Sequence, residues 1–586
     1  MRFVGIFAFI FAISVDIAGT SFATSDESAS QAVPESMTIA GPGIVDEAKL
    51  VEAAGESTLG DYLAGNFALD AGNIKEAATY FEKALADDPD NLELRRQVFM
   101  LDLADARYAA ALDEARALKA QRADETNEDA QLLLALEQAK AGAFDAVSGE
   151  LSDVGGQGIV ALAVPFLEAW SLVGIGGTDA IDEAVKALHN GESLGPLNEF
   201  HHAMLLARAD RLTESLAKLN EIVPETGGAP VRVAQAYADI LVRAGKADEA
   251  RTFLNGQLEL GERPVLRQAL IDMESGGRPG LPFDDEAAGI ADALLGIAEA
   301  LQRERGSARA ILYSRLALYL RPDLADANLL VGDVLASQDN WAAAIDAYRA
   351  ISDDSPLSYA ANVRRAQVLH SQEQQEQAFA LLSDLADVRP ERTDALIELG
   401  NLLRRDELYE RAEQAYSQAI ERIDAPQQEH WSLFYSRGIT YERTKRWPEA
   451  EADFLLALEL EPEQPFVLNY LGYSWVDQGL NLDKAKEMLH RAVDARPDDG
   501  FIVDSLGWVF YRLGDYEQAV EQLERAVELQ PGDPVINDHL GDAYWQVGRE
   551  REARFQWSRA LTLEPEEELI ATIREKLQSG LQDDRI

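Results

Sequence analysis

A pattern that repeats every 34 residues runs along most of this 586-residue chain and constrains its fold more than any other feature. The clearest unit extends from Pro534 to Glu567. Its characteristic residues are Leu540-Gly541, Tyr544, Ala553, Trp557, Ala560 and Pro565. The preceding unit fills the same offsets with Leu506-Gly507, Phe510, Ala519, Leu523, Ala526 and Pro531. Because several offsets recur together, the period indicates internal repeats.

The residue types at these offsets predict two packed helices in each unit. The small residue after Leu lets the first helix approach the second closely, and the Ala and the aromatic residue four positions later lie on one face of the second helix. The proline ends that helix and starts the turn into the next pair. One pair cannot bury its own apolar face, so neighbouring pairs must stack. The sequence therefore predicts an all-α fold, a superhelical solenoid of about fourteen helix pairs.

The 34-residue frame gives the order of the units along the chain. The predicted starts are Thr58, Leu92, Glu128, Leu162, Pro196, Val231, Ala291, Ala325, Tyr359, Thr393, Trp431, Pro465, Gly500 and Pro534. Units two to five lack most of the Gly and aromatic signals. We therefore predict a degenerate N-terminal block at 58–264 and a C-terminal block at 291–567.

Residues 265–290 interrupt the frame, and the Gly- and Pro-rich run from Ser275 to Pro282 predicts a linker there. The sequence leaves open whether this linker separates two solenoid blocks or is a long loop within one superhelix. Residues 568–586 are predicted to form a capping helix and a charged tail, because a terminal repeat needs a polar outer face.

This pattern resembles the tetratricopeptide repeat (TPR) family. The run from Leu468-Asn469-Tyr470-Leu471-Gly472-Tyr473 through Asp504-Ser505-Leu506-Gly507-Trp508 to His539-Leu540-Gly541 is similar to large proteobacterial exported TPR proteins. That group includes periplasmic adaptors of carboxyl-terminal-processing proteases and of cell-wall hydrolases. Its members are often outer-membrane lipoproteins, whereas this sequence lacks the cysteine that would carry the lipid. The resemblance implies a scaffold that binds protein partners.

The N-terminal residues predict an export signal at 1–23. A basic start at Arg2 precedes 13 apolar residues from Phe3 to Val15, a run too short to span a bilayer but suited to a signal-peptide core. Small residues at Ser21 and Ala23 favour cleavage after Ala23, which would leave a periplasmic or secreted protein. The alternative is an uncleaved anchor, which Asp16 disfavours. Residues 24–57 are rich in Ser, Ala, Pro and Gly and are predicted to be a flexible tether and lead-in.

Charge and cysteine content exclude several classes of partner and site. The chain has 53 basic and 103 acidic side chains, a net charge of −50, which disfavours nucleic acid and anionic membrane surfaces. After the export signal no apolar run approaches 18 residues, so no membrane span is expected. The absence of cysteine excludes thiolate metal sites, Cys nucleophiles and a lipid anchor on cysteine.

No motif in the sequence indicates a catalytic residue, a cofactor or a metal site. The seven histidines are His189, His201, His202, His370, His430, His490 and His539, and none lies in an HExxH arrangement. Adjacent helical residues such as His201 and His202 point about 100° apart and would not chelate one ion well. We therefore predict that the protein is not an enzyme and has no cofactor and no metal site.

The TPR resemblance implies a concave groove lined by the first helix of each pair. The matching positions are Tyr435, Asn469, Tyr473, Asp504, Trp508, Tyr511, Asp538, Asp542 and Trp545. Trp and Tyr dominate binding hot spots, so these aromatics are candidate contacts for a protein or peptide. Chaperone-type TPR clamps hold a carboxylate with Lys and Arg, whereas the three Asp residues here favour a basic, amine-bearing or extended peptide. The alternative is that the aromatics are buried against neighbouring helices.

Together these features predict a non-catalytic exported scaffold or adaptor that binds proteins or peptides through its groove. Its partners would include a periplasmic protease or a cell-wall enzyme, and the N-terminal block would hold a second protein. Two alternatives remain open. One is a self-associating assembly or export component of the cell envelope, and the other is an enzyme with an unrecognised site in 92–264.

Overall fold

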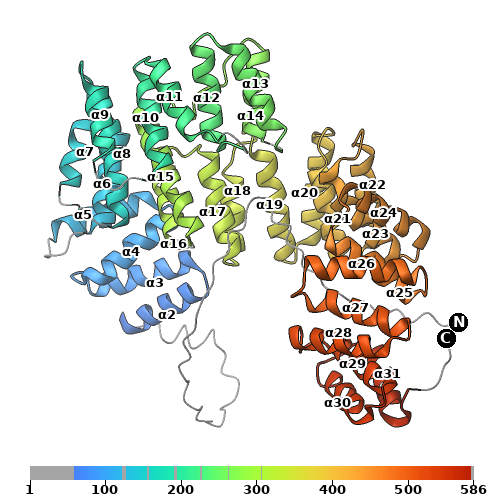
Figure 1. Cartoon of the computed structure of the whole chain (residues 1–586). Coiled ribbons are helices and arrows are strands. Elements are labelled where there is room, and N and C mark those ends of the chain that lie inside the picture. Colours follow the sequence, from blue (N-terminus) through green and yellow to red (C-terminus); the bar gives the residue numbers. More distant parts are fainter. Residues whose placement is uncertain are drawn as a thin grey trace. The chain divides into compact units, whose positions relative to one another are not determined.

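The computed structural model describes residues 58–121, 127–152, 154, 158–190, 194–224, 228–261, 263–304 and 306–581 (Figure 1). These residues form helices and no strand, which confirms the predicted all-α fold. The predicted signal peptide 1–23, the predicted tether 24–57 and the last residues of the tail, 582–586, lie outside the described residues. None of the described helices is both long and apolar enough to cross a membrane.

The chain divides into two compact units between Leu381 and Leu382, within helix α20 (Gln375–Val388). The first helices of the N-terminal unit are α2 (Thr58–Asp70), α3 (Ile74–Asp87), α4 (Leu92–Ala104), α5 (Tyr108–Ala120), α6 (Glu128–Lys140), α7 (Phe144–Leu151), α8 (Ile159–Ile175), α9 (Ala180–Leu188) and α10 (Pro196–Arg208). The later ones are α11 (Leu212–Ile222), α12 (Val231–Arg243), α13 (Ala247–Leu258), α14 (Pro264–Glu274), α15 (Glu286–Arg303), α16 (Ser307–Leu320), α17 (Ala325–Ser337), α18 (Trp341–Arg349) and α19 (Ser358–Ser371).

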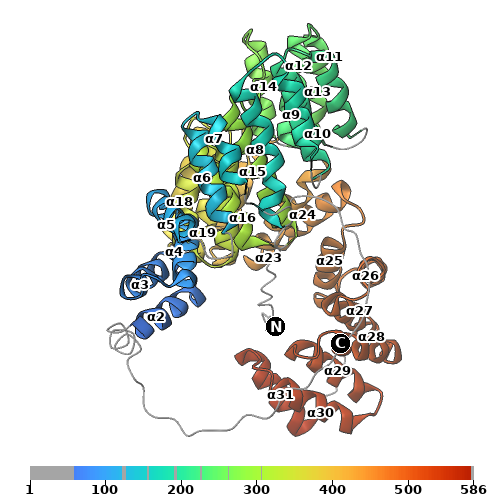
Figure 2. The ribbon, with the colours of Figure 1, turned by 90° about the vertical axis from the view of Figure 1, so that its left-hand side faces the viewer.

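The C-terminal unit continues the same succession of helices (Figure 2). Its elements are α21 (Asp394–Arg405), α22 (Tyr409–Glu421), the 3-10 helix η1 (Gln428–His430), α23 (Trp431–Arg443), α24 (Trp447–Leu460), α25 (Pro465–Asp477), α26 (Leu482–Ala495), α27 (Gly500–Arg512), α28 (Tyr516–Leu529), α29 (Pro534–Gln546), α30 (Glu550–Ala560) and α31 (Glu567–Ser579). One apolar core extends from α23 to α31, including the buried Leu569 and Ile573 of α31.

The described helices form fourteen consecutive pairs, from α2–α3 to α29–α30, with α14 and α31 outside the pairing. Most predicted unit starts coincide with the first residue of a helix, as at Glu128, Trp431 and Pro534. Two starts differ by a few residues, since α8 begins at Ile159 and α15 at Glu286. The predicted solenoid of about fourteen helix pairs is therefore confirmed.

The recurring spacing of Gly and aromatic residues corresponds to a direct contact in the pairs that carry both residues. A Cβ atom added to Gly438 on α23 would lie 2.6 Å from the ring of Phe454 on α24. The same addition at Gly541 on α29 would lie 2.4 Å from the Trp557 indole of α30. Both aromatic side chains are fully buried. The glycine therefore sets how closely the two helices approach.

The turn between the two helices of a pair is a left-handed C-cap. Gly548 after α29 has φ of 80°, and its N–H donates to Trp545 O at 3.0 Å while Arg549 N–H donates to Tyr544 O at 2.8 Å. This is the Schellman pattern, which satisfies the last carbonyls of the first helix. Glu407 and Lys445 take the same left-handed conformation in other repeats, with φ of 59° and 61°.

The interruption at 265–290 differs from the predicted linker. Helix α14 covers Pro264–Glu274 and α15 begins at Glu286, so only 275–285 is non-helical. This segment is packed against α12, because Gly280 N–H donates to Asp239 Oδ1 at 3.2 Å and Gln235 donates to Pro279 O at 3.2 Å. Both flanking helices belong to the N-terminal unit, whereas the two compact units divide at Leu381.

We expect Gly438→Val to destabilise the C-terminal unit by about 2–3 kcal/mol, because the added side chain overpacks a filled contact. Urea unfolding followed by circular dichroism measures this change. The matched control is Gly532→Val, since a Cβ at Gly532 meets nothing within 4 Å. Equal stability of the two variants would show that the glycine contact does not set the spacing of the pair.

Candidate functional site

The nine predicted groove residues all lie on the first helices of the last four repeats. Tyr435 is on α23, Asn469 and Tyr473 on α25, Asp504, Trp508 and Tyr511 on α27, and Asp538, Asp542 and Trp545 on α29. Tyr435 and the three Asp residues are buried, whereas the other five are half-buried. Position on the first helix therefore does not by itself make a residue available to a ligand.

Tyr435 is a packing residue. Its ring lies 6.1 Å from that of Phe454 and 5.8 Å from that of Tyr470, and its side chain is 9% exposed. Burial raises the pKa of its hydroxyl, so the phenol stays protonated. For this residue the structure agrees with the alternative that groove aromatics are buried against neighbouring helices.

Three rings form a stack across α27 and α29. The Trp508 ring centroid lies 4.6 Å from that of Tyr511 and 4.1 Å from that of His539, and both pairs are nearly parallel. His539 Nδ1 is 3.0 Å from Asp504 Oδ1. Burial lowers the pKa of His539, but Asp504, Asp538 and Asp542 together raise it by more, so the net pKa lies above the ordinary histidine value. Asp504 thus has a partner within the chain, and this contact holds the His539 ring at the end of the stack.

The other two groove carboxylates hold a lysine from the last helix of the chain. Lys576 of α31 places Nζ 2.7 Å from Asp538 Oδ2 and 2.8 Å from Asp542 Oδ2. The indole N–H of Trp557 donates to Asp542 Oδ1 at 2.9 Å. Burial raises the pKa of Asp542 to about 6, against the opposing effect of Lys576. The carboxylates expected to select a basic ligand are therefore already paired within the chain.

The aromatic strip, defined as Tyr473, Trp508 and Tyr511, keeps part of its surface open on consecutive first helices. Beside it on α25, Asn469 Oδ1 is buried and accepts no hydrogen bond from the described residues, so this atom is closed to a ligand. The partly exposed Tyr and Trp rings supply the apolar area that holds a protein segment.

On α4, α6, α8 and α10 of the N-terminal unit, other helices cover the corresponding face of the first helix. Helix α15 packs against α8 and α10, and α16 packs against α4 and α6 (Figures 1 and 2). We call the side of α4, α6, α8, α10 and α12 that these two helices cover the inner face. All residues of α15 from Ala288 to Ala298 are buried. Apart from Asp292, this stretch is apolar on every side, as expected for a helix surrounded by others.

Polar contacts and close packing hold α15 and α16 on the inner face. Arg232 of α12 contacts Asp292 at 2.9 Å and Glu299 at 2.6 Å. Arg309 of α16 contacts Asp129 of α6 at 2.8 Å. Because these helices cover the inner face, a second protein predicted to bind the N-terminal block finds that face occupied.

His201 belongs to this packing and is not a ligand for an ion. Its ring is fully buried, accepts a hydrogen bond at Nδ1 from the Trp170 indole at 3.2 Å and stacks on Phe283. Burial lowers its pKa to about 4, although Asp292 raises it. His201 therefore remains neutral inside the core at physiological pH.

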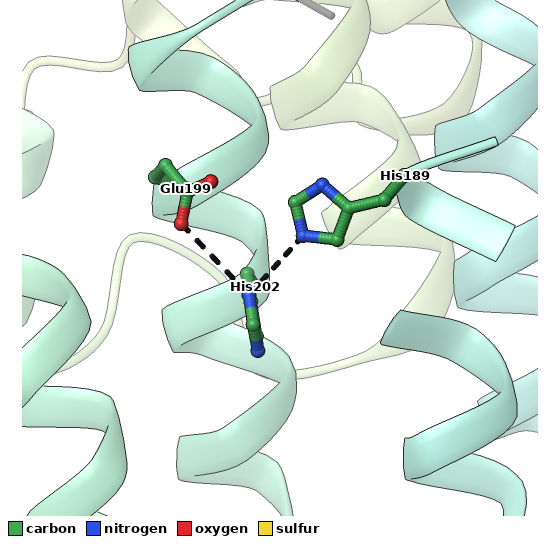
Figure 3. Close-up of side chains that lie close together, drawn as sticks. All are labelled: His189, Glu199 and His202. Atoms are coloured by element: carbon green, nitrogen blue, oxygen red, sulfur yellow. Dashed lines mark hydrogen bonds and ion pairs between the residues drawn. The ribbon is translucent and has the colours of Figure 1, made fainter. Parts of the chain in front are cut away.

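Sequence reasoning missed a different histidine cluster, formed by His189, Glu199 and His202 (Figure 3). His189 follows α9, and the other two lie on α10. The two histidines are 13 positions apart in the sequence, and their proximity depends on the turn between the two helices. The Glu199-x-x-His202 spacing, one helical turn, is the sequence signal that points to part of this cluster.

Comparison with known proteins identifies the repeats. A family model described as "TPR repeat" matches 507–548, and one described as "Tetratricopeptide repeat" matches 329–387 and 397–465. The chain therefore contains tetratricopeptide repeats. Gly438 and Gly541, which make the close contacts described above, lie in the matched ranges 397–465 and 507–548.

Curated relatives match over a limited length. A TPR repeat-containing protein of Pseudomonas aeruginosa is 27% identical over 197 residues, 33% of this chain and 32% of its own length. Bacteriophage adsorption protein A of Escherichia coli (strain K12) is 33% identical over 84 residues, 14% of this chain and 8% of its own length. The chain thus spans about a third or less of either relative. Among solved structures, the APC/C hetero-tetramer Cut9-Hcn1 has a TM-score of 0.37 and 15% identity, covering 92% of this chain and 99% of that chain.

Replacing Lys576 with Met leaves Asp538 and Asp542 buried without their cation, and we expect a loss of about 3–5 kcal/mol at pH 8. The loss should be smaller at pH 5. The folded-state pKa of Asp542, about 6, lies above its unfolded value of 3.8, so folding favours the protonated form. The contribution of protonated Asp542 to the free energy of unfolding is complete below pH 3.8 and is lost as pH rises through 6.

Urea unfolding at pH 5 and pH 8 measures the effect of Lys576→Met. The control is Lys484→Met on the exposed side of α26. A loss that is the same at both pH values would contradict the assignment of Lys576 as the counter-ion of these carboxylates.

Proposed function

We propose that this protein is an exported, non-catalytic adaptor that binds a protein partner through the aromatic strip of its C-terminal unit. TPR repeats are suited to protein–protein interaction, and this chain contains them at 329–387, 397–465 and 507–548. The observation that carries the proposal is the partly open Trp508–Tyr511 stack beside an internally neutralised acidic cluster.

The pairing of the carboxylates determines the chemistry of the partner. Asp538 and Asp542 hold Lys576, and Asp504 holds His539, so no free carboxylate of this group remains to attract a cation. Binding then depends on apolar and aromatic area, which Trp and Tyr supply with little loss of side-chain entropy. An extended segment with apolar side chains fits this surface.

The internal stack also prepares the surface for binding. The Trp508 ring is stacked between Tyr511 and His539, and Asp504 holds the His539 ring in place. A ring that is already ordered loses less conformational freedom when a partner covers it. The strip therefore combines a large contact area with a low ordering cost.

The location and the partner class rest on the sequence. The apolar run at Phe3 to Val15 and the small residues at Ser21 and Ala23 support export. The similarity of the last repeats to exported proteobacterial adaptors supports a periplasmic protease or a cell-wall enzyme as partner. In this proposal the protein supplies no catalytic group and acts by bringing its partner to a target.

Site-specific photocrosslinking tests the binding surface. The full chain carries p-benzoylphenylalanine in place of Tyr473 or, as a control, in place of Phe555, which is 62% exposed on α30. In the native envelope we expect one discrete crosslinked protein from position 473 and none of that mass from position 555. After identification by mass spectrometry, the purified partner should bind the wild-type chain.

Replacing both Trp508 and Tyr511 with Ala should weaken that binding by at least about 30-fold, because each ring is a hot-spot contact. The circular-dichroism melt should stay close to that of the wild type. A melt that collapses would identify the two rings as core residues, and unchanged binding would remove the strip from the interface.

Export is tested separately, by expressing the full chain in a proteobacterial host and fractionating the cells. We expect the protein in the periplasm or medium with Thr24 as its first residue by mass spectrometry, because Ser21 and Ala23 suit signal peptidase. Ala23→Arg should block cleavage. A full-length protein in the cytoplasm would contradict export without affecting the binding proposal.

A further inference from the structure

Three side chains with metal-ligand chemistry meet at the junction between the fourth and fifth helix pairs (Figure 3). His189 follows the last turn of α9, and Glu199 and His202 lie one turn apart on α10. His189 Nε2 is 3.2 Å from His202 Nδ1, and His202 Nδ1 is 3.9 Å from Glu199 Oε2. All three ligand atoms lie within 4.8 Å of one another.

These separations fit a tetrahedral zinc ion. Zinc binds imidazole nitrogen and carboxylate oxygen at about 2.0–2.2 Å, so the ligand atoms of a tetrahedral site lie about 3.3 Å apart. The two imidazole nitrogens already have this separation. The Glu199 oxygen is farther away, 3.9 Å from His202 Nδ1, and rotation of its side chain can bring it closer.

The Glu199 carboxylate lies beside His202 and Lys218. Its Oε2 atom is buried, 3.9 Å from His202 Nδ1 and 3.1 Å from Lys218 Nζ. The cluster therefore presents a carboxylate oxygen next to two imidazole nitrogens.

Lys218 is the competing cation at this site. Its Nζ lies 3.1 Å from Glu199 Oε2 and 3.0 Å from Glu221 Oε2. Because Lys218 has a second carboxylate partner, Glu199 can turn to a metal without leaving the ammonium unpaired. The positive charge of Lys218 nevertheless weakens metal binding, which makes it a useful position for a test.

We propose that His189, Glu199 and His202 bind one Zn²⁺ ion, with two imidazoles and one carboxylate as protein ligands. The exposed His189 leaves the fourth position accessible to water. Nitrogen and carboxylate donors of this kind suit zinc and not magnesium or calcium, which prefer all-oxygen sites. The ion joins the end of α9 to α10 and therefore clamps two successive repeats of the N-terminal unit.

The metal-free alternative is a hydrogen bond between two neutral imidazoles, which the same 3.2 Å distance allows. Substitution of the histidines by glutamine distinguishes the two cases. Glutamine retains a donor and an acceptor but is a poor zinc ligand. Substitution by glutamine therefore removes zinc binding while it leaves the hydrogen-bonding capacity of the junction.

Calorimetric titration with Zn²⁺ on the untagged, chelator-treated full chain tests the site. We expect one ion per chain, and at least a tenfold loss of affinity in His189→Gln and in His202→Gln. His490→Gln, at an exposed histidine on α26, is the matched control and should bind as the wild type does. Lys218→Gln should bind more tightly than the wild type, because it removes the competing charge.

The proposal fails if the wild type binds no more zinc than the double variant His189→Gln/His202→Gln, or if all variants bind equally. Circular dichroism checks that the variants fold. Should a variant unfold, X-ray absorption on the zinc-loaded wild type decides the question. Two imidazole ligands at the metal support the site, and fewer than two overturn it.

Discussion

The close approach of two helices over a glycine is the contact on which the rest of this structure depends. At Gly438 and Gly541 an aromatic ring of the second helix lies where a side chain of the first would otherwise stand. This contact buries the ring, and it places the remaining positions of the first helix toward the next repeat or toward the groove. Helix pairs built in this way stack into an array in which each pair completes the core of its neighbour.

A second constraint is charge, because the chain has a net charge of −50 and buries several carboxylates. Several of these buried groups are matched by a specific cation, such as Lys576 for Asp538 and Asp542, or Arg232 for Asp292. Leaving a buried carboxylate unpaired costs several kcal/mol, so these cations are part of the fold. The repulsion of the acidic surface is thus tolerated because the interior is neutralised locally.

The repeat pattern made the fold predictable, since Gly, Ala, aromatic and Pro at 34-residue spacing specify both helices of a pair and their contact. It also placed Tyr473, Trp508 and Tyr511 on first helices. It could not show that Lys576 returns to Asp538 and Asp542, or that His189 meets His202, because both contacts depend on how successive elements turn in space. The packing of α15 on the inner face was invisible for the same reason, although its run from Ala288 to Ala298, apolar except for Asp292, is the corresponding signal.

The position of α15 and α16 has a consequence for the order in which the chain folds. Most solenoids fold through contacts between adjacent repeats, so their contact order is low. Here Asp129 pairs with Arg309, and the Tyr108 hydroxyl donates to the carbonyl of Arg315, across 180 and 207 residues of sequence. During synthesis the first repeats emerge with their inner face uncovered until α16 has been translated. The N-terminal unit therefore closes late and cooperatively, more as a globular domain than as an open array.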